Sequence, residues 1–291
     1  MKVVLDAGNG AAGILAHNMF TALGHEVISI NKDPDGNFPN HHPDPSKENN
    51  LVDIKNKMIS TNADIGFAFD GDGDRVGLIT NEGKSVIADK IIMLMAEFYL
   101  NQTKGPIVFD VKCSNQLPLL IKKFGGKPIM EKTGHFNIKK RIRETNAVMG
   151  GEMSGHIFIN HDWYGFDDAI YSAVILTKIV SESNISTSEL VNRIPSMHAT
   201  PELNLNIKEE EKFNLIEKFK SQMKFPNADI NTIDGVRISI GNSWALMRAS
   251  NTSSKLVFRF EGDTEDDLKQ IKDLFESNFL RIFPDIQLDY N

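Results

Sequence analysis

The chain has 291 residues, of which 41% are hydrophobic and 24% charged, and its formal net charge is −7. This composition is typical of a globular protein with about two or three domains. The negative charge argues against sequence-independent binding of nucleic acid, which needs a basic face. No apolar run approaches the roughly 20 residues that span a membrane. The single cysteine, Cys113, excludes a disulfide framework within the chain and indicates a reducing, cytoplasmic compartment.

The first part of the chain alternates strands and helices. Residues 1–6 read as a core strand and carry no signal-peptide pattern. A helix follows, which ends at Gly24 and has an expected apolar face of Ile14, Leu15, Met19, Phe20 and Leu23. Beyond it we expect a strand over 27–30, a loop over 31–47, a helix over about 48–60, strands over 65–69 and 76–80, and a turn at 81–83. This pattern predicts a first α/β domain over residues 1–82.

The remaining elements predict two further domains. A second α/β domain over residues 83–195 contains helices over 91–100, about 114–124 and 169–180, and strands over 107–111, 147–152 and 156–160. After a linker over 193–201, a smaller α+β domain over residues 196–291 contains a helix over 209–221 and strands near 235–240, 243–248 and 255–260. Its closing helix has Leu268, Ile271, Phe275 and Phe279 on one face, with Thr264 as N-cap and Asp267 in the first turn.

Three carboxylates alternate with glycines directly after the apolar run 65–69. Asp70, Asp72 and Asp74 are separated by Gly71 and Gly73, and glycine lets the backbone bend so that alternate side chains converge. Carboxylates this close repel one another, which favours raised pKa values or a bound cation. Hard oxygen ligands suit Mg²⁺ or Ca²⁺. The run therefore predicts a metal site at the end of a strand.

Competing interpretations of the acidic run exist. Asp-Gly repeats also form exposed turns. An EF-hand requires Gly at its sixth position and Glu at its twelfth, and this chain has Arg75 and Asn81 there, so that interpretation fails. A Mg²⁺-dependent phosphatase with a nucleophilic aspartate, Asp70 or Asp72, remains an alternative.

Two further motifs have a structural interpretation that we prefer. Gly8-Asn9-Gly10-Ala11-Ala12-Gly13 matches a dinucleotide fingerprint, but the second expected strand is followed by Asn31 and not by an acidic residue. A tight turn with close helix–sheet packing is the favoured interpretation. Adjacent histidines rarely share one metal, so His41-His42, in a Pro-rich stretch, indicates a structural loop and not a zinc site.

Three polar stretches carry groups suited to a phosphorylated sugar. Glu152, Ser154 and His156 lie on one short turn, and their side chains can exchange hydrogen bonds with sugar hydroxyls; a plain β-turn is the alternative. His135 precedes an expected helix and is either a proton shuttle or a buried histidine with a partner, whereas Lys139, Lys140, Arg141 and Arg143 read as a solvated face.

The third stretch joins two strands of the last domain. Arg248 offers a planar fork of donors that suits phosphate, and Ser250, Asn251 and Thr252 add short donors. A turn also aims backbone N–H groups at the same anion. A polar hairpin turn without a ligand is the alternative.

Together these stretches resemble the α-D-phosphohexomutases, the family of the bacterial phosphomannomutase/phosphoglucomutases, over essentially the whole chain. The resemblance rests on 70–75, 132–135, 151–156, Trp163-Tyr164-Gly165-Phe166-Asp167-Asp168 and 248–252, in the family's order. Met153 resembles the mannose and glucose mutases, since glucosamine mutases more often have Gln there. The absence of Pro after Thr252 is a small departure.

The resemblance implies a role for each candidate residue. Asp70, Asp72 and Asp74 would bind Mg²⁺, and Glu152, Ser154 and His156 would hold the sugar. Lys112 and His135, with Arg75 beside the metal loop, match catalytic or ligand-contact positions, and Lys90 stands where related mutases often have Arg. Arg248, Ser250, Asn251 and Thr252 would hold the non-reacting phosphate.

The implied reaction interconverts hexose 6-phosphate and hexose 1-phosphate of glucose or mannose through a 1,6-bisphosphate that also serves as activator. The family's first domain carries a phosphoserine in a Ser-His-Asn-Pro type motif, which this sequence does not contain. We therefore expect the chain to correspond to the last three of four domains and to need a separate or missing phosphoserine domain as partner. A phosphosugar-binding fragment without turnover is the second hypothesis.

Overall fold

The structure, a computed structural model, describes residues 1–290 and divides into two compact units. Unit 1 comprises residues 1–113, 117–130 and 134–195, and unit 2 comprises residues 114–116, 131–133 and the chain from Ser196 onward. Each unit has its own core. Within the described residues no helix has both the length and the apolar character that a membrane crossing requires.

The first sheet of unit 1 is mixed and has the strand order β2-β1-β3-β4-β5. β1 pairs in parallel with β2 and β3, whereas β4 pairs antiparallel with β3 and β5. The elements are β1 (Lys2–Asp6), α1 (Ala12–Ala22), β2 (Glu26–Ile30), η1 (Glu48–Leu51), α2 (Val52–Thr61), β3 (Ile65–Phe69), β4 (Val76–Thr80) and β5 (Ser85–Val86). Every residue of β3 is buried, as expected for a central strand covered on both faces.

The predicted apolar face of α1 is partly wrong, although Phe20 is buried and Met19 packs against the core as expected. Ile14, Leu15 and Leu23 are 49%, 57% and 52% exposed, while Ala12, Gly13, Ala16 and Phe20 are the buried residues. The helix packs so closely on its surroundings that a Cβ at Gly13 would lie 2.0 Å from the carbonyl oxygen of Lys32. Close approach near Gly13 selects small residues there, so Ile14 and Leu15 lie outside the core, whereas Phe20 is buried further along the helix.

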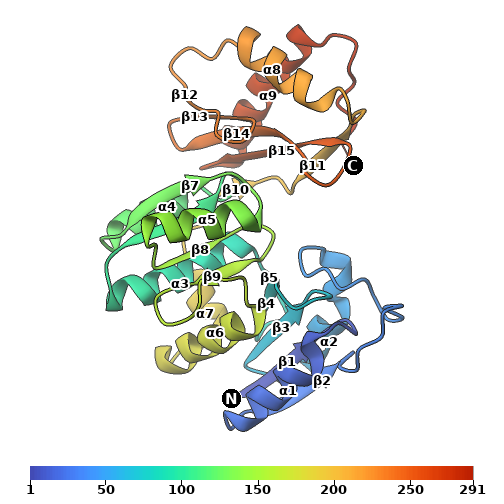
Figure 1. Ribbon diagram of the computed structural model, residues 1–291, viewed down its shortest axis with the longest axis vertical. Coiled ribbons are helices and arrows are strands. Elements are labelled where there is room, and N and C mark those ends of the chain that lie inside the picture. The colour runs from blue at the N-terminus through green and yellow to red at the C-terminus, as the bar shows by residue number, and fades with distance from the viewer. Residues whose placement is uncertain (291) are drawn as a thin grey trace. The chain divides into compact units, whose positions relative to one another are not determined.

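The second sheet of unit 1 has the order β7-β6-β8-β9, in which β8 is parallel to β6 and antiparallel to β9. Its elements are α3 (Ala88–Gln102), β6 (Pro106–Asp110), α4 (Gln116–Lys123), β7 (Lys127–Glu131), α5 (His135–Thr145), β8 (Met149–Gly151), β9 (Ile157–Ile159), α6 (Ala169–Ser183) and α7 (Thr187–Asn192). One hydrophobic cluster includes Phe67 of β3, Phe109 of β6 and Leu176 of α6. The two sheets of unit 1 therefore share a core through α6 (Figure 1).

Unit 2 is built on an antiparallel sheet with the order β10-β15-β14-β13-β12, and β11 also pairs with β15. Its elements are β10 (His198–Ala199), β11 (Leu203–Asn206), α8 (Lys212–Gln222), β12 (Asp229–Asn231), β13 (Val236–Ile240), β14 (Ser243–Ala249), β15 (Lys255–Gly262) and α9 (Glu265–Ile282). Helices α8 and α9 cover one face of this sheet (Figure 1). Phe219 and Phe275 meet there with ring centroids 5.1 Å apart.

The expected N-terminus of the last helix is confirmed. Thr264 caps α9, and its side chain and that of Asp267 form a reciprocal capping box. The predicted fold class is confirmed as well: two mixed α/β sheets are followed by an α+β part with an antiparallel sheet. The three predicted domain boundaries stay a prediction.

Candidate active site

The acidic loop, residues 70–75, joins β3 to β4 and is shaped by its first carboxylate. Asp70 is 1% exposed, and its Oδ1 accepts hydrogen bonds from the backbone N–H groups of Gly73, Asp74 and Arg75 at 3.0–3.1 Å. Gly73 takes φ +82° against Ala12 of α1, a conformation that glycine adopts without strain. Hydrogen bonds between the Asp70 side chain and the loop's backbone N–H groups thus fix the shape of the loop.

Arg75 closes the acidic loop with two ion pairs. Its Nε donates to Asp70 Oδ2 at 2.6 Å and its Nη1 to Asp44 Oδ1 at 3.2 Å. Burial alone would lower the pKa of Arg75, but the hydrogen bond to Asp70 and the surrounding carboxylates raise it. Asp44 comes from the Pro-rich loop, where sequence reasoning found no functional residue. No local sequence pattern around Asp44 predicts a contact with Arg75, which lies 31 residues further along the chain.

The three carboxylates of the loop form one candidate cation site. Asp70, Asp72 and Asp74 each offer an oxygen within 4.8 Å of the others. Burial raises the pKa of Asp70, and Arg75 opposes this change. Asp72 is exposed, and its carboxylate has no hydrogen bond or ion pair among residues 1–290. An all-carboxylate donor set of this kind suits a hard divalent cation such as Mg²⁺.

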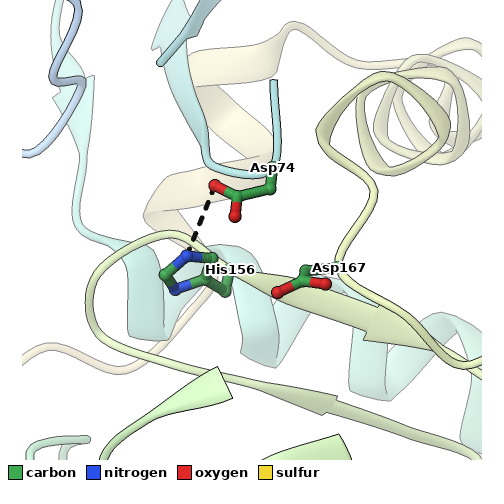
Figure 2. Close-up of side chains that lie close together, drawn as sticks. All are labelled: Asp74, His156 and Asp167. Atoms are coloured by element: carbon green, nitrogen blue, oxygen red, sulfur yellow. Dashed lines mark ion pairs between the residues drawn. The ribbon is translucent and has the colours of Figure 1, made fainter. Parts of the chain in front are cut away.

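His156 joins the acidic loop to the polar loop formed by residues 152–156. Its Nε2 lies 3.4 Å from Asp74 Oδ1 (Figure 2). Its Nδ1 lies 3.1 Å from Glu152 Oε2. Burial lowers the pKa of His156, but the hydrogen bonds to Asp74 and Glu152 outweigh it and raise the pKa to about 9. Burial likewise opposes the charged form of Asp74, yet the hydrogen bond and charge of His156 hold the pKa of Asp74 at about 2.

A second group, Asp74, His156 and Asp167, also brings three possible ligand atoms within 4.8 Å (Figure 2). It is the poorer metal site. Both ring nitrogens of His156 already have carboxylate partners, since Nε2 lies 3.4 Å from Asp74 and Nδ1 3.1 Å from Glu152. Both Asp167 oxygens already face cationic or donor groups, since Oδ1 pairs with Lys139 and Oδ2 with His135.

The polar loop holds one deeply buried carboxylate. Glu152 is 1% exposed, and its Oε1 accepts from the backbone N–H of Gly134 at 2.5 Å. Its own N–H donates to the carbonyl of His156 at 2.9 Å, which closes the turn. Ser154 Oγ lies 2.7 Å from His156 Nδ1. Residues 152–156 therefore form a turn whose polar side chains also lie close together.

Asp110 is the last residue of β6 and Lys112 follows it, and both are buried. Asp110 is fully buried, and its Oδ1 accepts from the backbone N–H of Met153 at 3.2 Å, while Lys112 Nζ lies 3.9 Å from its Oδ2. Burial raises the pKa of Asp110, and the positive charge of Lys112 opposes that change. Asp110 thereby ties the Lys112 segment to the polar loop, a contact that sequence reasoning missed.

The structure excludes one of the two interpretations of His135 and corrects the interpretation of Lys139. His135 is not buried, because its side chain is 55% exposed, and it lies 3.0 Å from Asp167. Lys139 is not merely part of a solvated face, because its Nζ lies 2.9 Å from Asp167 Oδ1. Lys90 sits in the first turn of α3, and its side chain makes no hydrogen bond or ion pair within residues 1–290.

The remaining candidates belong to unit 2: Arg248 lies near the end of β14, and Ser250, Asn251 and Thr252 lie in the turn between β14 and β15. Arg248 is 4% exposed, and its Nε donates to Asp234 Oδ2 at 2.8 Å. Its Nη2 is buried and has no hydrogen-bond partner among the described residues. Ser250 Oγ lies 2.8 Å from Ser253 Oγ and accepts from the Thr252 N–H at 3.4 Å. Asn251 Nδ2 donates to the carbonyl of Thr133 at 3.3 Å, a contact within unit 2.

The glycine-rich turn after β1 supports the acidic loop directly. A Cβ at Gly10 would lie 2.7 Å from the carbonyl oxygen of Gly71, and the N–H of Ala11 donates to that same oxygen at 2.9 Å. His41 Nε2 lies 3.0 Å from Asp6 Oδ2 at the end of β1. This geometry agrees with a structural role for both stretches.

Three profiles of one protein family match consecutive parts of the chain. Residues 1–83 match the α/β/α domain II of phosphoglucomutase/phosphomannomutase, residues 88–197 its α/β/α domain III and residues 202–277 its C-terminal domain. The chain belongs to the phosphoglucomutase/phosphomannomutase family.

Individual relatives agree with this assignment. A phosphomannomutase/phosphoglucomutase of Pseudomonas putida is 49% identical over the whole chain, and a phosphoglucomutase of Neisseria meningitidis serogroup A is 44% identical over 98% of it. A crystal structure of a phosphoglucomutase/phosphomannomutase family protein from Burkholderia thailandensis is 43% identical, with a TM-score of 0.94 over 99% of this chain and 62% of its own. The chain spans 63% of the length of both curated relatives.

Proposed function

We propose that this chain provides the Mg²⁺-binding, sugar-binding and phosphate-binding parts of a phosphohexomutase that interconverts hexose 6-phosphate and hexose 1-phosphate of glucose or mannose through a 1,6-bisphosphate. The observation that carries the proposal is the link through His156, which pairs with Asp74 of the acidic loop and with the buried Glu152 of the polar loop. A cation site and a sugar-type hydrogen-bonding site are thereby held next to each other. The names of the relatives agree with this chemistry.

The metal assignment follows from the donor set. Asp70, Asp72 and Asp74 would hold Mg²⁺, which when bound neutralises charge on a phosphoryl group in transfer. Arg75 adds a guanidinium fixed by Asp70 and Asp44. Its remaining donors suit phosphoryl oxygens.

The sugar and proton-transfer assignments concern the second sheet of unit 1. Glu152 and Ser154 would hydrogen-bond the sugar hydroxyls, with His156 fixing their loop. Lys112 and His135 would donate and accept the proton of the reacting hydroxyl. Lys90, whose side chain has no internal partner, would contact the ligand phosphate.

The phosphate assignment rests on Arg248. A buried guanidinium nitrogen without a partner carries a desolvation penalty of about 1–3 kcal/mol or more, and an anion would remove it. Ser250, Asn251 and Thr252 would complete the hold on the non-reacting phosphate. Because the relatives are longer than this chain, the phosphoserine would come from a further domain, and the parts described correspond to domains at 1–82, 83–195 and 196–291.

The test is titration calorimetry with glucose 1,6-bisphosphate in the presence of Mg²⁺. We expect binding by the wild-type chain and an affinity loss of at least about tenfold in Glu152→Gln, the size of one charge-assisted hydrogen bond. Glu182→Gln, at an exposed position of α6, is the charge-matched control and should bind as the wild type does.

Two results would contradict the proposal. If the folded wild-type chain does not bind the bisphosphate, the proposed sugar-phosphate site is refuted. Release of inorganic phosphate from the ligand, abolished by Asp70→Asn or Asp72→Asn, would instead identify a phosphatase with a nucleophilic aspartate.

A further inference from the structure

Asp167 and Asp168 are neighbouring carboxylates that do different things. Asp168 caps α6, because its Oδ1 accepts from the Tyr171 N–H at 2.9 Å, and its Oδ2 accepts from Trp163 Nε1 at 3.1 Å. Asp167 takes no part in this cap. Its side chain is 8% exposed and is directed at α5, where it meets His135 and Lys139. Asp167 thus contacts two side chains of α5, whereas Asp168 caps the N-terminus of α6.

Packing alone does not hold the His135 ring. The side chain is 55% exposed, and its contacts are Asp167 Oδ2 at 3.0 Å, Lys139 Nζ at 3.1 Å from Nδ1, and a stack on the ring of His156 with centroids 5.8 Å apart. Both polar contacts involve Nδ1. The partner of Nδ1 decides which ring nitrogen carries the proton in the neutral imidazole.

Two arrangements compete at Nδ1. In one, Nδ1–H donates to the Asp167 carboxylate, and Nε2 keeps the lone pair. In the other, the Lys139 ammonium donates to an unprotonated Nδ1, and Nε2 carries the proton. The first makes a charge-assisted hydrogen bond, whereas the second sets the nitrogen lone pair against the Asp167 oxygen 3.0 Å away. Lys139 also has Asp167 Oδ1 at 2.9 Å as an acceptor, so the first arrangement satisfies both side chains.

We propose that Asp167 is a positioning residue that holds the neutral His135 ring in its Nδ1–H form and leaves Nε2 as the proton acceptor. The mechanistic meaning rests on the proposed function, in which His135 exchanges a proton with the reacting hydroxyl. A carboxylate behind an imidazole orients the ring and selects the tautomer in the same way wherever a histidine acts as a base. Lys139 balances the charge of Asp167 and does not choose the tautomer.

The test is the tautomeric state of His135, measured by long-range ¹H–¹⁵N correlation of the imidazole ring in the full chain over a pH series. The His135 signals are assigned with His135→Gln. We expect the Nδ1–H form to dominate in the wild type once the ring is neutral. Asp167→Asn should make the Nε2–H form dominant, because the amide can donate to Nδ1 through its own N–H.

Lys139→Met is the matched control, since it removes the other partner of Nδ1. It should leave the Nδ1–H form dominant, whereas a switch in this variant would assign the choice to Lys139 and overturn the proposal. A dominant Nε2–H form in the wild type overturns it directly and needs no variant to fold. These readouts do not depend on sugar phosphate, so a chain that fails to bind bisphosphate yet shows the Nδ1–H form refutes the proposed function alone.

Discussion

In unit 1, the charges of the acidic loop and its surroundings alternate in sign from the buried Asp70 through the half-buried Arg75, Asp74 and His156 to the buried Glu152. In unit 2, the buried Arg248 pairs with Asp234 through Nε, but its Nη2 has no partner within the described residues. In the first region these five charges are paired with one another, whereas Asp72 has no hydrogen bond or ion pair among residues 1–290. The second holds a buried donor without a partner, which the phosphate of the proposed function would satisfy.

The difference has an energetic meaning. Paired and hydrogen-bonded charges tolerate burial, whereas removal of one partner leaves the other uncompensated. The Nη2 atom of Arg248 has no hydrogen-bond partner among the described residues, so its removal leaves no other group unpaired. Variants of the two regions should therefore separate stability from ligand response.

The largest effect is expected for His156→Gln. The change strands the buried Glu152 and the neighbouring Asp74, and should lower the free energy of unfolding by about 3–5 kcal/mol. Denaturant unfolding at pH 6 measures it. Lys140→Gln, which removes an exposed pair with Glu144, is the control and should cost less than about 1 kcal/mol. An equal decrease in the free energy of unfolding of both variants would show that the His156 ion pairs stabilise the fold no more than an exposed pair does.

A smaller effect is expected for Gly10→Ala, which tests whether the acidic loop is held rigidly from behind. A Cβ there would lie 2.7–2.9 Å from backbone atoms of Asp70 and Gly71, and such overpacking typically costs about 1–3 kcal/mol. Because the loop must shift, the Mg²⁺ affinity measured by calorimetry should fall as well. Gly36→Ala meets no atom within 4 Å and is the control. Unchanged Mg²⁺ affinity in Gly10→Ala would mean that the loop is not held by this turn.

The third prediction concerns the unpartnered nitrogen of Arg248. Inorganic phosphate at ten times its dissociation constant should stabilise the wild type by about 1.4 kcal/mol, seen as a rise in the thermal unfolding temperature. Arg248→Met should abolish this rise. Arg281→Met, at an exposed position of α9, removes the same charge elsewhere in unit 2 and should retain it. Loss of the response in both variants would indicate nonspecific charge screening.

The smallest effect is a pH dependence through His41. Burial lowers the pKa of His41, but its hydrogen bond to the His42 carbonyl and its contact with Asp6 outweigh this and raise it above 6.5. The folded state therefore binds the proton more tightly than the unfolded state. The stabilisation is fully present below pH about 6.5 and is lost as the pH rises through the folded pKa.

Urea unfolding of the wild type and His41→Gln at pH 5.5 and pH 9 measures this dependence. We expect the stability difference between the two proteins to be larger at pH 5.5. A difference that grows toward pH 9 would contradict the assigned direction.

Strand and helix positions were largely predictable because local patterns encode them. The fully apolar run of β3, the glycine that ends α1 and the capping box of α9 all appear where the sequence indicates them. The face of α1 was predictable only in part: Phe20 is buried as expected, but the close approach of Gly13 to Lys32 leaves Ile14 outside the core. Hydrophobicity alone carries no information on how near a helix lies to its neighbour.

The same division holds for the candidate site. The sequence by itself determined the family, because the order of its motifs is specific, and the spacing of Asp70, Asp72 and Asp74 predicted a cation site. Only the tertiary structure decided the partners, since Asp44, Asp110 and Asp167 act over distances in the chain that no local pattern records. Charges pair according to distance in space, and that distance is set once the sheets have packed.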